Sequence, residues 1–151
     1  MRKIFLNLIK RIRKFIFWLW NQEGSPAQRA LGFGIGIFSG CFPFFGLQTL
    51  MGVFLARILK GNSLLAAMGT WISNPFTYIP LYYFNYRVGS LLLNADLDIV
   101  DFDYITISEL WSQGWHLSFR LLAGSICVGL VTGIVGGFCL YFPLKKFANT
   151  I

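Results

Sequence analysis

Charged and catalytic residue types are scarce in this chain, and their scarcity argues against several classes of protein. Only 13% of its 151 residues are charged, six residues are acidic, and His116 is the one histidine. The long apolar stretches contain no aspartate or glutamate, which argues against a proton-driven transporter. No paired carboxylates and no nucleophile beside a base are visible. The sequence therefore predicts a protein that is not an enzyme and holds no cofactor.

Cysteine is also rare. Cys41, Cys127 and Cys139 fall inside apolar segments and show no CxxC spacing and no neighbouring histidines. Neither a metal site nor a disulfide framework is expected from such a pattern. We expect the three cysteines to be small buried apolar residues.

Polar surface is lacking as well, because 56% of the residues are hydrophobic and 18% are aromatic. A soluble domain of this length presents more polar surface, so the composition predicts one compact all-α integral membrane domain. The formal charge is +7, but six of the thirteen basic residues lie in the first fourteen positions beside bulky apolar side chains. This pattern favours a bilayer with anionic headgroups as the partner, and not a nucleic acid.

Residues 1–20 have helical periodicity, with apolar residues on one face and basic residues on the other. We expect a basic amphipathic interfacial helix, followed by a linker over residues 21–29. A signal peptide is the weaker interpretation, because the apolar stretch is short and ends in Trp18-Leu19-Trp20. The side chains expected to contact lipid headgroups are Lys3, Lys10, Arg11 and Lys14.

Residues 30–95 are expected to form the membrane core. Two uncharged apolar runs, one from Arg29 to Arg57 and one from Lys60 to Arg87, are each longer than the roughly 20 residues that a spanning helix needs. Pro43 and Pro75 break the two runs near their centres. We favour a re-entrant hairpin that turns back at Pro43, with a full crossing as the alternative, and we expect both breaks to face an interior cavity or groove.

Uncharged polar residues gather around the two breaks. Their first interpretation is structural, because they can satisfy backbone groups freed by proline. Their second is a polar notch that holds a lipid headgroup or another small solute between broken helices. The candidate notch residues are Pro43, Gln48, Thr49, Thr70, Asn74, Pro75, Thr77 and Tyr78.

Small residues recur at four-residue steps in two places, a spacing typical of close helix packing in membranes. We expect both faces to pack against other helices, with each other as one candidate pairing. The alternative is that glycine is simply common in membrane helices. The two faces are Gly32, Gly36 and Gly40, and Ser125, Gly129, Gly133 and Gly137.

Residues 96–120 hold five of the six acids and are expected to form an acidic extracytoplasmic loop followed by an interfacial helix. Thr106 and Glu109 match a capping box, so this helix is expected to begin there. The acidic spacing lacks the glycine and the final glutamate of a calcium loop. Residues 121–144 are predicted to be a C-terminal transmembrane helix and residues 145–151 a basic cytoplasmic tail, with both termini cytoplasmic.

The strings GIFSGCFPFFGLQT at 36–49 and GTWISNPFTYIPLYYFNYRVG at 69–89 resemble a bacterial membrane family catalogued as domain of unknown function 2062. The likeness covers about the middle third of the chain. It implies a small multi-span membrane protein with no assigned activity, of a kind sometimes joined to glycosyltransferase-like enzymes of the cell envelope. A role in cell-envelope glycolipid chemistry would rest on this resemblance of fold alone, and not on any residue of this chain.

The expected function is to handle or transport a lipid-like or small polar solute at the notch, in a bacterial cytoplasmic-type membrane. The alternative is a structural or assembly partner of other membrane proteins or envelope-biosynthesis enzymes, or a homo-oligomer. A membrane-embedded enzyme ranks third, because no residue spacing supports it.

Overall fold

The computed structural model describes residue 10 and residues 22–93 and 107–148, and these residues are almost entirely helical. No strand occurs in these ranges, so the predicted all-α class is confirmed for them. The predicted interfacial helix, Lys10 excepted, and the acidic residues Asp96 to Asp103 lie outside the described residues. The elements are α2 (Pro26–Gly40), α3 (Leu47–Ile58), α4 (Ser63–Gly69), the 3-10 helix η1 (Thr70–Ile72), α5 (Tyr78–Leu92) and α6 (Ile107–Ala148).

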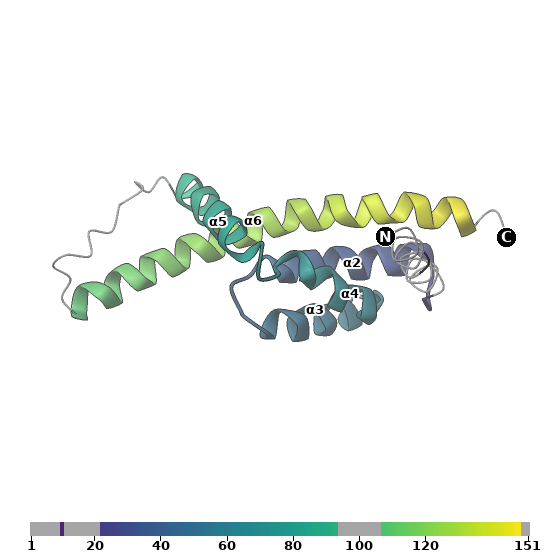
Figure 1. Ribbon diagram of the computed structural model, residues 1–151, viewed down its shortest axis with the longest axis horizontal. Coiled ribbons are helices and arrows are strands. Elements are labelled where there is room, and N and C mark those ends of the chain that lie inside the picture. The colour runs from purple at the N-terminus through teal and green to yellow at the C-terminus, as the bar shows by residue number, and fades with distance from the viewer. Residues whose placement is uncertain (1–9, 11–21, 94–106, 149–151) are drawn as a thin grey trace, which may run out of the picture.

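The long helix α6 organises the arrangement (Figure 1). Helix α2 lies along the carboxyl-terminal half of α6, and α5 crosses the middle of α6. Helices α3 and α4 pack on α2 and on each other. Helix α2 is therefore sandwiched between α6 on one side and the α3–α4 pair on the other.

The starts and ends of the helices follow from local chemistry. The Ser25 hydroxyl accepts a hydrogen bond from the Gln28 amide at 3.2 Å, and the Gln28 side chain accepts one from the Ser25 amide at 2.8 Å. This capping box, with Pro26 in the first turn, starts α2. Helix α2 ends before Pro43, and α5 begins after Pro75. Both proline-containing stretches thus lie between helices, as predicted.

Helices α2 and α3 form a hairpin, and the residues after the end of α3 bond to the start of α2. The Asn62 amide donates to the Gln28 carbonyl at 2.9 Å, and the Asn62 side-chain amide donates to the Glu23 carbonyl at 2.9 Å. The Asn62 side-chain oxygen also accepts from the Leu65 amide and so caps α4. The chain therefore returns, after α3, to the end of the bundle at which α2 began.

Helix α6 is described from Ile107 onward, and the predicted capping residue Thr106 lies outside the described residues. It then continues without interruption through residue 120, so the expected interfacial helix and the expected transmembrane helix are one helix. No proline occurs in it before Pro143, and nothing in its backbone ends it earlier. Among the described residues, α6 supplies the one helix that is long and apolar enough to cross a membrane, over Gly114–Lys146.

The two predicted small-residue faces contact different neighbours. A Cβ atom added to Gly32, Gly36 or Gly40 would meet the backbone of Asn62, Ala66 or Thr70, so this face lies against α4 and η1. On α6, Gly129, Gly133 and Gly137 lie against Phe38, Gly34 and Ala30 of α2, and Ser125 bonds to α5. The α6 face therefore meets α2 around Gly34, away from the Gly32 face.

Helices α5 and α6 approach most closely where Gly89 meets Gly124. A Cβ atom on Gly124 would collide with the Asn85 carbonyl oxygen, and one on Gly89 would collide with the Arg120 carbonyl oxygen. Both obstacles are backbone atoms of packed helices, so neither can move aside cheaply. Glycine is required at this crossing for the two helices to touch.

We predict that Gly124→Ala lowers the thermal stability of the purified protein, because the added methyl group overlaps the α5 backbone. Gly114→Ala is the matched control on the same helix, since a Cβ atom there meets nothing within 4 Å among the described residues. Its better helix propensity, about 1 kcal/mol, should leave stability unchanged or raised. Melting curves in detergent measure both variants. Equal melting temperatures for the two would contradict the observed crossing.

Candidate functional site

The carboxyl-terminal end of α2 carries backbone carbonyls that the helix cannot satisfy. Two side chains of α5 bond to them across the break at Pro43. The Asn85 side-chain amide donates to the Cys41 carbonyl at 2.8 Å, and the Tyr82 hydroxyl donates to the Phe42 carbonyl at 3.2 Å. Tyr82 and Asn85 are three residues apart and so share one face of α5. The end of α2 is thereby tied to α5.

Asn85 extends this connection to α6. Its side-chain amide also donates to the Ser125 hydroxyl at 3.0 Å, and both residues are 0% exposed. The Cys41 sulfur lies 3.6 Å from the Thr132 hydroxyl of α6. One buried polar cluster thus joins α2, α5 and α6 where the three helices meet. Sequence reasoning missed Asn85 and Tyr82, although an asparagine inside an apolar helical stretch was a visible signal.

The candidate notch residues Gln48, Thr49 and Thr70 come together beside this cluster. The Gln48 side-chain amide donates to the Ser73 hydroxyl at 2.9 Å, and the Thr49 and Thr70 hydroxyls share a hydrogen bond of 3.1 Å. The Thr70 hydroxyl also donates to the Ala67 carbonyl at 2.7 Å. These bonds connect the start of α3 to η1 across the interior.

Asn74 and Thr77 form a local turn at the second break. The Thr77 hydroxyl donates to the Ile72 carbonyl at 2.6 Å and accepts from the Asn74 amide at 2.9 Å. The Asn74 side-chain oxygen accepts from the Phe76 amide at 2.9 Å. These side chains therefore satisfy backbone groups of the break itself, which is what the structural interpretation of the notch requires.

The remaining notch candidates are more peripheral. Pro75 is exposed and Pro43 is half-buried, each in its own turn. Tyr78 begins α5 and packs its ring against Phe45, with 5.0 Å between the ring centroids.

Four buried polar side-chain atoms have no hydrogen-bond partner among the described residues. They are Gln48 Oε1, Asn85 Oδ1, Ser39 Oγ and Ser90 Oγ.

The three cysteines differ in exposure, and all three are free thiols. Cys41 is buried and Cys127 is half-buried, but Cys139 is exposed. The expectation of a buried residue is wrong for Cys139, because the face of α6 that carries it packs against no other described helix.

An apolar groove of about 560 Å³ lies between α2, α3 and α6. None of the candidate notch residues lines it. Its lining is apolar side chain or glycine except for the hydroxyl of Tyr141. No sequence pattern indicated it, because it depends on the approach of α3 to the other two helices. The lining residues are Ala27, Ala30, Leu31, Gly34, Ile35, Phe38, Leu55, Leu59, Gly129, Leu130, Gly133, Ile134, Gly137, Phe138 and Tyr141.

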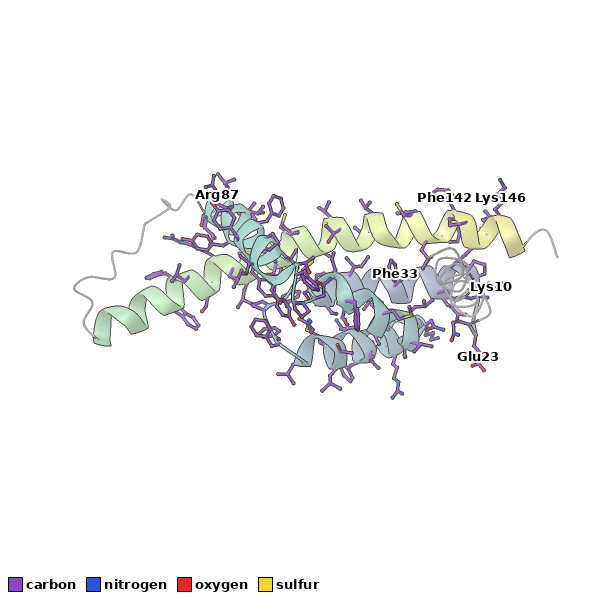
Figure 2. All side chains as sticks on the ribbon, viewed as in Figure 1. Lys10, Glu23, Phe33, Arg87, Phe142 and Lys146 are labelled. Atoms are coloured by element: carbon purple, nitrogen blue, oxygen red, sulfur yellow. The ribbon has the colours of Figure 1, made fainter. Side chains whose placement is uncertain are left out.

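Basic side chains gather at the end of the bundle where α2 begins and α6 ends. Figure 2 shows Lys10, Glu23 and Lys146 at this end and Arg87 toward the other. Of the predicted headgroup contacts, Lys10 is exposed, whereas Lys3, Arg11 and Lys14 lie outside the described residues. The basic residues of α2, α3 and α6 at this end, with the loop after α3, are Arg29, Arg57, Lys60, Lys145 and Lys146.

The fold and these two features define a helical protein with a buried polar cluster at its helix breaks and an apolar groove beside it. The family model described as "Uncharacterized protein conserved in bacteria (DUF2062)" matches residues 9–150, so the chain belongs to this bacterial family. No curated protein and no solved structure matches the chain.

We predict that Asn85→Ala destabilises the protein by about 1–3 kcal/mol, because it leaves the buried Cys41 carbonyl and the Ser125 hydroxyl without their donor. Ser90→Ala is the control on the same helix, since the Ser90 hydroxyl is buried and has no partner among the described residues. Removing it should cost nothing or raise stability. Chemical unfolding in detergent compares the two variants. An equal loss for both would show that the Asn85 bonds contribute little.

Proposed function

We propose that this chain is an integral membrane protein of a bacterial cytoplasmic-type membrane and a non-enzymatic module that handles a membrane lipid. The distribution of its side chains carries the proposal. Trp71, Phe76 and Ile79 are 77%, 92% and 83% exposed, whereas Ser39, Asn85 and Ser125 are 0% exposed. Large apolar residues thus lie on the outside and polar residues on the inside. This distribution is typical of a protein surrounded by lipid, because soluble proteins rarely present large apolar patches to water.

The placement of charge supports one orientation. The uncharged part of α6, Leu121–Leu144, is about 36 Å long, which is enough to cross about 30 Å of hydrocarbon. Arg120 and Arg87 lie toward one end of this band and Lys145 and Lys146 at the other. The second end is the richer in lysine and arginine, so we assign it to the cytoplasm together with both termini.

The α2–α3 hairpin is then a re-entrant element. Helix α2 has 15 residues and α3 has 12, so they are about 22 Å and 18 Å long, and neither reaches across the bilayer. The bond from the Asn62 amide to the Gln28 carbonyl returns the chain to its starting end. The turn at Pro43 lies at membrane depth, where non-helical backbone is tolerated only inside protein. The bonds from Tyr82 and Asn85 meet that requirement.

The groove supports lipid handling better than the polar notch does. Most hydrogen-bonding groups of the notch already bond to one another or to the backbone of the breaks. The groove offers open apolar volume instead, in the range of roughly 300–1,000 Å³ that small-molecule sites occupy. We therefore place the lipid in the groove and give the notch residues the structural role of closing the helix breaks.

A second candidate function is assembly with another membrane helix, in a homo-oligomer or with an envelope protein. Leu130, Ile134 and Phe138 recur at four-residue steps on α6, line the groove and are 49%, 58% and 59% exposed, so they offer an apolar stripe to a partner helix. A protein that stays bound in place of lipid would favour this candidate.

The proposed orientation predicts that Arg57→Cys and Lys145→Cys face the same side of the membrane. In intact cells both should resist a membrane-impermeant maleimide and react after permeabilisation, whereas Arg87→Cys should react from outside. The wild-type protein measures the background from its three native cysteines. Reaction of Arg57→Cys from outside would mean that the α2–α3 segment crosses the bilayer and does not return.

The groove predicts that Leu130→Trp reduces the amount of lipid that copurifies with the protein in native lipid particles, because the larger ring fills the groove. Val131→Trp is the matched control, since Val131 is 59% exposed on the same helix and does not line the groove. Quantitative mass spectrometry of retained lipid compares the two variants. Equal retention in both would remove the groove as a lipid site.

A further inference from the structure

We infer that the lipid in the groove is anionic, with one acyl chain along the groove and its phosphate-bearing headgroup at the end formed by Tyr141 and Lys145. This inference rests on the proposed function and adds the chemical class of the ligand. Three features of the groove carry it, namely its length, the polar groups at its one end, and the charge of the bundle around that end.

The length of the groove suits one acyl chain. Its lining on α6 runs from Gly129 to Tyr141, which is about 18 Å along the helix axis. One leaflet contributes about 15 Å, half of the roughly 30 Å of hydrocarbon in a bilayer. The groove therefore extends from the basic end of the bundle to about the middle of the membrane. An acyl chain that extends through one leaflet therefore fits the groove. A polar solute would find almost no polar partner along the groove lining.

The end of the groove near Tyr141 carries the groups that a lipid phosphate needs. The Tyr141 hydroxyl is the one side-chain polar group in the lining, and it can donate a hydrogen bond. The Lys145 ammonium lies 5.7 Å from the centre of the Tyr141 ring. Because residues four apart share a helix face, Lys145 lies on the same side of α6 as the lining residue Tyr141. The apolar lining thus ends at a tyrosine whose ring has the Lys145 ammonium group beside it.

The charge around this end favours an anion. The basic residues described there include Arg29, Arg57, Lys60, Lys145 and Lys146, because α2 begins, α3 ends and α6 ends at this side of the bundle. Glu23 is the one acidic residue described at this end. Arg57 is exposed at this end, but it is two residues from both Leu55 and Leu59, which line the groove. At about 100° per residue it lies on the opposite face of α3. Arg57 and Lys145 therefore share the end of the bundle but differ in their access to the groove.

This difference provides the test. The full-length protein is reconstituted in vesicles of equal phosphatidylcholine and phosphatidylglycerol with identical acyl chains, repurified gently, and its retained lipid is quantified by mass spectrometry. We expect about fivefold enrichment of phosphatidylglycerol for the wild type, since one lysine near an anionic surface contributes about that factor. Lys145→Glu should abolish the enrichment, and Arg57→Glu should keep most of it.

Several outcomes would overturn the inference. Equal amounts of the two lipids on the wild-type protein would exclude a preference for anions. Equal losses in Lys145→Glu and Arg57→Glu would mean that general surface charge, and not the groove, attracts the lipid. Leu130→Trp separates this failure from that of the proposed function. If it lowers total retained lipid while the wild type shows no preference, the groove binds lipid without regard to charge. If it changes nothing, the proposed function itself fails.

Discussion

The structure depends on how the carbonyl groups at the end of α2 are satisfied. Pro43 prevents the helix from continuing, and the break leaves the Cys41 and Phe42 carbonyls in an apolar interior without helical partners. An unpaired buried carbonyl costs on the order of 1–3 kcal/mol. Asn85 and Tyr82 supply the two donors from α5. The turn between α2 and α3 is therefore possible because α5 lies beside it.

Glycine makes that proximity possible. Asn85 reaches both the Cys41 carbonyl and Ser125 of α6 because α5 and α6 touch where Gly89 meets Gly124. A side chain at either glycine would push the helices apart and move Asn85 away from its acceptors. Close packing and the pairing of buried polar groups therefore depend on each other. The glycines set the distance between α5 and α6, and the hydrogen bonds of Asn85 determine which turns of the helices lie side by side.

The sequence predicted the features that depend on neighbouring residues and missed those that depend on distant ones. The breaks at Pro43 and Pro75 follow from local chemistry, and the structure has both between helices. The predicted cap of α6 at Thr106 lies outside the described residues and stays a prediction. The Asn85 bond to the Cys41 carbonyl joins residues 44 positions apart, and the groove needs three separate helices. The glycine spacing indicated close packing, but spacing alone does not identify the neighbour. The predicted division of α6 at residue 120 came from the change there from polar to apolar residues, but the helix continues through this position.

The separation between the polar cluster and the groove bears on the kind of ligand. A route for a polar solute needs polar groups that are exposed to the solute and not committed elsewhere. Here the polar groups of the breaks are buried or half-buried, and most of them bond to backbone or to each other, whereas the open volume beside them is apolar. The residues that make the turn at Pro43 possible are consequently not those that a ligand would meet. This arrangement favours a lipid chain over a polar solute, since a chain needs apolar surface along its length and polar groups only at its end.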